Sequence, residues 1–189
     1  TIAALKAINV STLTNNQVIK VNGYYASGDG GGGFYLYSSG SSSTDDGGAV
    51  IQPTTGAGRY LRIFDDTDRF SVRWWGAKGD YNGSTGTDDS VAVAACVTYA
   101  KNNKKLGTNI NWVYFPEGYY YTRVPAVNYI DVAFEGAGIG LTRLRHVNGF
   151  AEPLIYVTGP ATIAAGARTI ATPYGGCRNM SLIAGTLTY

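Results

Sequence analysis

The chain has 189 residues, only 15% of them charged, and its formal net charge is +2. Neither nucleic-acid binding nor membrane insertion is predicted, because the charge is weak and no apolar run reaches the roughly 18 residues of a membrane span. Glycine, with 26 residues, and tyrosine, with 15, favour strands and turns over a helical fold. Cys96 and Cys177 do not make a disulfide framework, and Cys96, among alanines and valines, is expected to be a buried free thiol.

The first 69 residues predict a small β-rich module. Ile2 to Ile8 places apolar residues on one side of a short helix, and Gln17 to Tyr25 alternates polar and apolar residues as a strand does. A glycine-rich turn, residues 28–33, follows. Three further strands are expected at Phe34–Tyr37, Ala49–Pro53 and Arg59–Phe64, with residues 65–68 as the exit turn.

The strongest signal in the chain is a helix from Asp88 to about Lys105, which ends in lysines before a glycine. Thr87 is expected to be its N-cap, which places Asp88 and Asp89 in the first turn, near the positive end of the helix dipole. The bulky pair Trp74–Trp75 predicts a strand before the helix, and a loop with several glycines, residues 76–86, joins the two.

The remaining sequence predicts β coils. Apolar strand centres are expected at Phe115, Phe134, Ile155 and Ile183, and the first two intervals are 19 and 21 residues. The last interval is longer and has room for another strand around Ile163 to Ile170. A spacing of about 20 residues is typical of a solenoid, in which each coil contacts only its neighbours.

Several of these segments resemble, in order, the start of the pectate-lyase-like superfamily. They are Trp75–Asp80 (WGAKGD), Thr87–Asp89 with the small-residue helix, Trp112–Tyr121, Val132–Arg145 and Cys177–Gly185. The resemblance covers about residues 70–189. It implies a right-handed parallel β-helix whose open end is capped by the single α-helix.

The front of the chain has a resemblance of its own. Residues 21–37 (VNGYYASGDGGGGFYLY), 44–53 (TDDGGAVIQP) and 58–64 (GRYLRIF) are similar to segments that precede the β-helix in bacteriophage tailspikes and related tail adhesins. The resemblance implies a homotrimer in the phage tail that acts outside the cell. Its front module would contact other tail proteins, and its downstream body would bind host surface polysaccharide.

The fold class predicted from these patterns and resemblances is mainly β. Residues 1–69 are expected to form a small virion-proximal module, and residues 70–189 a helix cap with the first coils of a right-handed β-helix. The chain is expected to be part of a longer polypeptide. Three functions stay open: a tailspike whose body binds and depolymerises polysaccharide by hydrolysis or elimination, a secreted pectate-lyase-like enzyme, and a non-catalytic glycan adhesin.

No cofactor or metal site is predicted. Residues 28–33 fit G-x-G-x-x-G, but a strand rather than a helix follows, so a turn is favoured over a nucleotide site. Asp80, Asn82 and Ser84 have the alternating oxygens of a calcium loop, which then lacks the glycine at its sixth position and the acid at its twelfth. His146 is the only histidine, and nothing around it predicts zinc.

No catalytic residue is predicted either. A glycosidase needs two carboxylates in one cleft, and the expected coils supply Glu117, Asp131, Glu135 and Glu152. These four are interpreted as solvent-facing turn acids. Along Tyr119 to Tyr121 the side chains should alternate between two faces, and packing in a core or an interface is favoured over glycan binding.

Overall fold

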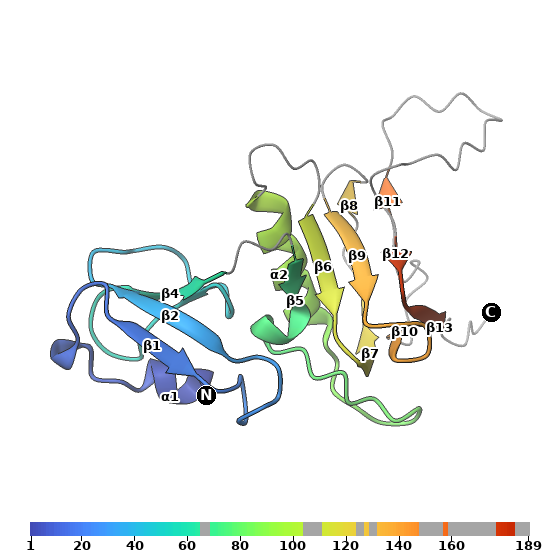
Figure 1. The fold of residues 1–189 in the computed structure, drawn as a ribbon, viewed down its shortest axis with the longest axis horizontal. Helices are drawn as coiled ribbons and strands as arrows, with labels where there is room; N and C mark the ends of the chain where they lie inside the picture. The colour runs from blue at the N-terminus through green and yellow to red at the C-terminus, as the bar shows by residue number, and fades with distance from the viewer. Residues whose placement is uncertain are drawn as a thin grey trace.

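The computed structural model describes residues 1–64, 69–103, 111–123, 127–128, 132–147, 157–158 and 177–183. In these residues a small antiparallel sheet precedes three parallel sheets and a helix (Figure 1). The expected exit turn at 65–68, the strand centre Ile155 and the extra strand near Ile163 lie outside the described residues.

The front sheet has the strand order β1-β2-β4-β3, and all its pairs are antiparallel. Its elements are α1 (Ile2–Lys6), the 3-10 turn η1 (Val10–Thr12), β1 (Val18–Val21), β2 (Gly33–Ser38), β3 (Val50–Ile51) and β4 (Arg59–Ile63). The inner face of the sheet buries tyrosines. Tyr35, Tyr37 and Tyr60 pack there with Ile2 and Leu5 of α1.

The first strand is shorter than expected, because residues 22–25 leave the ladder. The Asp29 carboxylate accepts hydrogen bonds from the backbone N–H groups of Tyr24, Tyr25, Ala26 and Gly31, at 2.7 to 2.9 Å. Burial alone would raise the pKa of Asp29, but these N–H groups stabilise its ionised form and hold the pKa below its usual value. The glycine-rich segment is therefore a turn organised around one carboxylate.

The second half of the described structure consists of parallel strands only. One sheet contains β5 (Arg69–Ser71), β6 (Asn111–Phe115), β9 (Val132–Gly136) and β12 (Cys177–Arg178). A second contains β7 (Gly118–Thr122), β10 (Thr142–His146) and β13 (Ser181–Ile183), and a third β8 (Val127–Asn128) and β11 (Val157–Thr158). Every pair in these sheets joins strands of successive coils, which is the arrangement of a parallel β-helix.

Stacked apolar side chains fill the interior of the coils. Phe70, Val113 and Phe134 lie opposite one another in β5, β6 and β9, and Tyr120 lies opposite Leu144 in the second sheet. All five are buried. The expected strand centres Phe115, Phe134 and Ile183 all lie in strands, but Ile183 pairs with Arg145 of the second sheet whereas the other two lie in the first. A spacing measured along the sequence does not distinguish the sheets, since each coil contributes a strand to more than one of them.

The tryptophan pair does not form a strand. Val72–Trp75 is a 3-10 helix, η2, whose start is capped by the Ser71 hydroxyl, which accepts a hydrogen bond from the Arg73 N–H. Gly76 ends the helix with a φ of 93°, a left-handed conformation that favours glycine. A local capping residue and one glycine thus override the strand preference of two tryptophans.

The long helix, α2 (Ser90–Asn102), starts two residues later than expected, with Asp89 at the N-cap position. Thr87 is not the cap, because its N–H and hydroxyl both donate to Asp80. The Asp89 carboxylate makes no capping bond and instead accepts from the backbone N–H groups of Lys78 at 2.7 Å and Gly79 at 3.0 Å. Burial raises the pKa of Asp89 to about 6, although these two bonds act to lower it.

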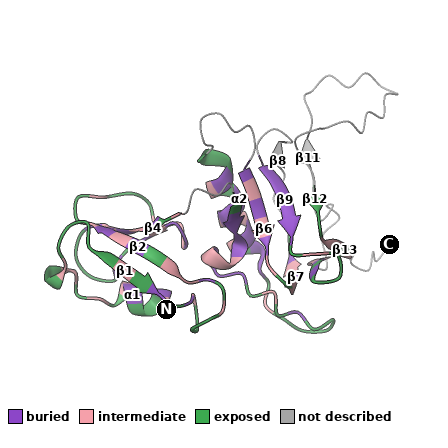
Figure 2. Cartoon of the chain, in the orientation of Figure 1, coloured by how far each residue is buried: buried purple, intermediate pink, exposed green. Residues whose placement is uncertain are grey.

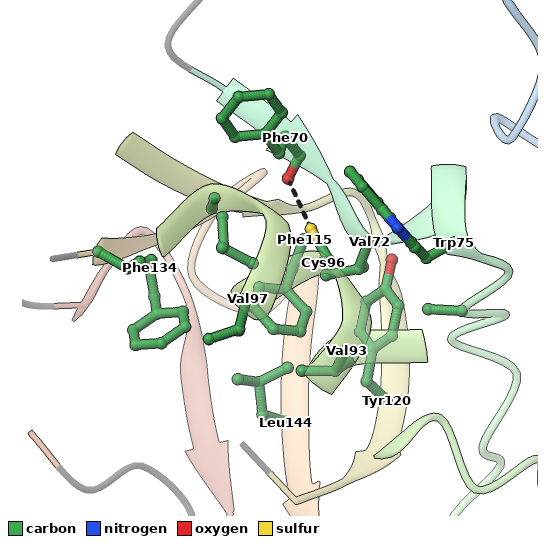
Figure 3. Close-up of a cluster of buried hydrophobic side chains, with 14 of the residues drawn as sticks. Phe70, Val72, Trp75, Val93, Cys96, Val97, Phe115, Tyr120, Phe134 and Leu144 are labelled. Carbon is green, nitrogen blue, oxygen red and sulfur yellow. Dashed lines mark hydrogen bonds between the residues drawn. The ribbon is translucent and has the colours of Figure 1, made fainter. Parts of the chain in front are cut away.

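Helix α2 packs against the interior of the coils (Figure 3). Val93, Cys96, Val97 and Ala100 are buried in the same cluster as the stacked side chains of β5, β6 and β9. Cys96 is a free thiol, as expected, and donates to the carbonyl oxygen of Phe70 at 3.5 Å. The helix lies beside β5, the first strand of its sheet, and so caps the end of the coils (Figure 1).

Candidate functional site: the junction of the two parts

One arginine connects the front sheet to the coils. Arg73 of η2 donates from Nη1 to the carbonyl oxygen of Asp29 at 2.9 Å and from Nη2 to that of Glu117 at 2.7 Å. Its Nε also lies 3.4 Å from the hydroxyl of Tyr120, a buried residue of the coil interior. One guanidinium therefore forms hydrogen bonds with the glycine-rich turn of the front sheet, with the turn between β6 and β7, and with the core of the coils.

A second arginine holds the other side of this contact. Arg62 of β4 is only 8% exposed, and its guanidinium stacks 4.4 Å from the ring centre of Trp74 in η2. It also donates to the Tyr35 hydroxyl at 2.8 Å and to the carbonyl oxygens of Gly31 and Gly32. Burial lowers the pKa of Arg62, and the interaction with Tyr35 opposes that shift.

Aromatic rings make the apolar core continuous across the contact. Phe64, after β4, lies 5.6 Å from Trp74 and 5.3 Å from Tyr99 of α2, measured between ring centroids. Ala49 is buried in the same cluster as α2, and a Cβ added at Gly48 would lie 2.6 Å from the Trp75 ring. We call this region, formed by Arg62, Phe64, η2 and residues 24–32, the junction.

A small cavity of about 240 Å³ opens at the junction. Its lining residues are Tyr24, Tyr25, Ala26, Asp29, Arg73, Ala77 and Lys78. The Tyr25 hydroxyl donates to the Gly76 carbonyl oxygen at 3.0 Å, and the Lys78 ammonium lies 4.9 Å from the centre of the Tyr25 ring. The polar groups of this cavity therefore hold the two parts together.

The three consecutive tyrosines alternate as expected. Tyr120 points into the core, whereas Tyr119 and Tyr121 pack on Tyr81 from the loop before α2. The Tyr81 and Tyr121 rings are stacked with centroids 5.0 Å apart. A shallow pocket of about 320 Å³ lies beside them, lined by Tyr81, Asn82, Glu117, Gly118, Tyr119, Gly140, Leu141 and Arg143.

The candidate acids do not form a pair in the described residues. Glu117 is exposed in its turn, as expected. The interpretation of Glu135 as a turn acid is wrong: it lies in β9, is 5% exposed, and is paired with Arg69 at 2.9 Å and Arg178 at 3.1 Å. Two arginines from other coils neutralise it. Asp131 and Glu152 lie outside the described residues.

The other candidate ligands have local partners. Asn82 Oδ1 accepts hydrogen bonds from the backbone N–H groups of Ser84 and Thr85, while Asp80 binds Thr87. The Nδ1 of His146 lies 2.7 Å from the carbonyl oxygen of Val147. Where the structure describes the chain, no group of three or more His, Cys, Asp or Glu side chains is placed to hold a metal ion. In the same ranges, no helix has the length and apolar character needed to cross a membrane.

Comparison with known sequences identifies the front sheet. Residues 1–65 match the family described as a phage tail protein small four-stranded β-sheet domain. The observed sheet has the four strands β1, β2, β4 and β3 within that range. The match covers about a third of the chain, and we call residues 1–65 the phage tail domain after it. No curated protein sequence matches the chain.

Comparison with solved structures identifies the rest of the fold. Tailspike protein gp49 of Acinetobacter baumannii bacteriophage Fri1, described as a capsular polysaccharide depolymerase, is similar over 72% of this chain, with a TM-score of 0.60 and 24% identity. The enzymatically active domain of bacteriophage CBA120 tailspike protein 2 is similar over 98%, with a TM-score of 0.59 and 19% identity. The Acinetobacter phage vB_ApiP_P1 tailspike is similar over 98%, with a TM-score of 0.61 and 17% identity.

At these identities the likeness concerns the fold, and it confirms the expected class: a small β module, a helix cap and the coils of a tailspike-type right-handed β-helix. The chain covers 22%, 26% and 29% of the three tailspike chains. This chain, with its phage tail domain and first coils, therefore spans less than a third of the length of each of these tailspike chains.

Proposed function

We propose that this chain is the N-terminal part of a phage tailspike that links the virion tail to a receptor-binding body. The observation that carries this proposal is the pairing of a phage tail domain at residues 1–65 with tailspike-type coils. The phage tail domain implies a place in the virion tail. We further propose that it contacts other tail proteins and that the division between the two parts falls near residue 69.

The junction suits a mechanical link. A flexible connection would let the body swing on the tail, whereas here Arg73 bonds both parts and the apolar core runs through Phe64 and Ala49 without a break. Hydrogen bonds from a charged donor contribute about 1.5 to 3 kcal/mol each when partly buried. The junction therefore holds the phage tail domain in one orientation on the coils.

We also propose that the body, as a homotrimer acting outside the cell, binds host surface polysaccharide. Support comes from a relative described as a capsular polysaccharide depolymerase and another described as a glycan biofilm-modifying enzyme. The phage tail domain favours this role over that of a secreted pectate-lyase-like enzyme. Incubation of the complete protein with capsule or O-antigen separates a depolymerase from a non-catalytic adhesin, because only the former releases shorter oligosaccharides.

The linking role is tested by deleting residues 1–65 from the spike gene of the phage. We expect purified virions to lack the spike on immunoblots, whereas the deleted protein expressed alone keeps the β-rich circular dichroism of the coils. A charge change on exposed Val91 of α2, Val91→Glu, is the matched control and leaves spike incorporation unchanged. Virions that carry the deleted spike in normal amounts would overturn the proposed role of the phage tail domain.

A further inference from the structure

The shallow pocket beside the tyrosine rings has no part in linking the two halves of the chain. It lies where the loop before α2 meets the turns that precede β7 and β10, and Figure 2 shows the tip of that loop, residues 82–86, exposed beyond β7. Its volume of about 320 Å³ is at the lower end of the roughly 300 to 1,000 Å³ of small-molecule sites. The lining side chains with useful chemistry are Tyr81, Glu117, Tyr119, Leu141 and Arg143.

Backbone hydrogen bonds hold the walls of this pocket in place. The Tyr81 N–H donates to the Tyr119 carbonyl oxygen at 2.9 Å, and the Tyr119 N–H donates to that of Gly79 at 2.9 Å, so the loop follows the edge of β7. The Gly118 N–H donates to the Leu141 carbonyl oxygen at 3.0 Å and ties in the turn before β10. A ligand therefore meets a formed site, which lowers the cost of binding.

Two charged groups of the pocket are left for a ligand. Among the residues that the structure describes, neither Glu117 nor Arg143 has an oppositely charged group within ion-pair distance. The exposed Arg143 guanidinium donates from Nε to the Gly140 carbonyl oxygen at 3.2 Å and lies 5.6 Å from the centre of the Tyr119 ring. No bond of its two Nη groups occurs in the described residues, so these donors are available.

The other walls are aromatic and apolar. Tyr81 packs edge to face with Tyr119, with ring centroids 4.9 Å apart, and Leu141 is 50% exposed. Arg145 lies on the same face of β10 as Arg143 and places a second guanidinium 5.7 Å from the centre of the Tyr81 ring. The pocket and its immediate surroundings thus combine tyrosine rings with two guanidinium groups and one carboxylate.

We propose that this pocket binds a single sugar unit that carries a carboxylate, such as a hexuronic acid, an inference that rests on the proposed binding of polysaccharide and places one contact for it. The guanidinium of Arg143 binds a carboxylate through two parallel hydrogen bonds. The ionised Glu117 only accepts hydrogen bonds and so suits sugar hydroxyls. The C–H groups of a sugar ring pack against the tyrosine rings and Leu141. A neutral sugar lacks the group that pairs with Arg143, so the pocket favours the acid.

Binding of glucuronate and glucose to the purified complete protein tests this inference, because the two sugars share a ring and differ in one carboxylate. Saturation-transfer NMR titrations give dissociation constants for the wild type, Arg143→Gln and Lys101→Gln. Lys101 is exposed in the last turn of α2, so its substitution removes the same charge outside the pocket. We expect the wild type and Lys101→Gln to bind glucuronate at least about tenfold more tightly than glucose, and Arg143→Gln to lose this preference.

Equal affinity of the wild type for the two sugars would overturn the inference, and so would a preference that persists in Arg143→Gln. Because Arg143 is exposed, the variant should keep the circular dichroism spectrum and urea midpoint of the wild type, which makes the comparison independent of folding. A parallel binding assay with host capsule separates this inference from the proposed function. Capsule binding without glucuronate binding contradicts only the inference, whereas glucuronate binding that requires Arg143, without capsule binding, contradicts only the proposed function.

Discussion

The helix cap gives the sharpest prediction. Val93 of α2 is completely buried in the cluster that contains Tyr120 and Leu144, whereas Val91, two residues earlier on the same helix, is 83% exposed. We therefore compare Val93→Asp and Val93→Ala with Val91→Asp. The two aspartate variants have the same composition and differ only in which face of α2 receives the charge.

The expected magnitudes follow from burial. Val93→Ala removes two buried methyl groups at about 0.8 kcal/mol each and leaves a small cavity, which gives a loss of roughly 2 kcal/mol. Val93→Asp also places a carboxylate in a cluster of buried apolar side chains, so its cost should exceed roughly 4 kcal/mol, a large part of the 5 to 15 kcal/mol typical of a domain. Val91→Asp lies in the first turn of α2, where a negative charge is neutral or slightly stabilising.

Urea unfolding followed by circular dichroism measures the three changes. Because the free energy of unfolding falls by about 2 kcal/mol per molar urea, Val93→Ala should lower the urea concentration at the midpoint of unfolding by about 1 M. Val93→Asp should lose the folded baseline or aggregate, because uncovered strand edges pair with other chains. If Val93→Asp unfolds at the same urea concentration as Val91→Asp, α2 does not cover the coil interior and the reasoning is wrong.

Three further predictions concern polar contacts. Arg73→Ala should cost about 2 kcal/mol and split the single calorimetric unfolding transition into two, whereas Arg143→Ala, at an exposed arginine, should leave one transition. Asp89→Ala leaves two backbone N–H groups without an acceptor and should cost roughly 2 to 3 kcal/mol in urea unfolding, with Asp89→Asn less affected. The pKa of Asp29 is lower in the folded than in the unfolded chain, so the ionised carboxylate stabilises the fold above the unfolded pKa, near 4, and this stabilisation is lost as pH falls through the folded pKa. Between pH 7 and pH 3, the melting temperature of Asp29→Ala should therefore fall less steeply than that of the wild type. Equal dependence of the two melting temperatures on pH would refute this.

The coils could be predicted from the sequence because their signal is repeated and local. Apolar side chains such as Val113 and Phe134 recur at the spacing of one coil, and neighbours in the stack are also close in the sequence. The helix was predicted for a similar reason, since the small apolar residues around Cys96 and the terminal lysines all lie within one segment.

The features that could not be predicted from the sequence depend on contacts between segments that are distant in the chain. Asp89 has the right residue type for the first turn, but the N–H groups of Lys78 and Gly79 take its carboxylate, and no pattern within the helix reveals that. Glu135 is buried because Arg69 and Arg178 come from coils that precede and follow it in the stack. The junction was missed altogether, because the sequence around Arg73 does not reveal its distant partners and its role depends on where Asp29 and Glu117 fold.

The partners of Arg73 have a consequence for how such spikes can evolve. Two of its three bonds go to backbone carbonyl oxygens, at Asp29 and Glu117, and every residue type supplies a carbonyl. The contact therefore requires a chain path rather than particular side chains, together with a glycine at position 48 that leaves space for the Trp75 ring. A front domain that has this path and keeps Arg62, Phe64 and Gly48 would fit the same body, so recombination between phages could exchange front domains at this point without redesign of the coils.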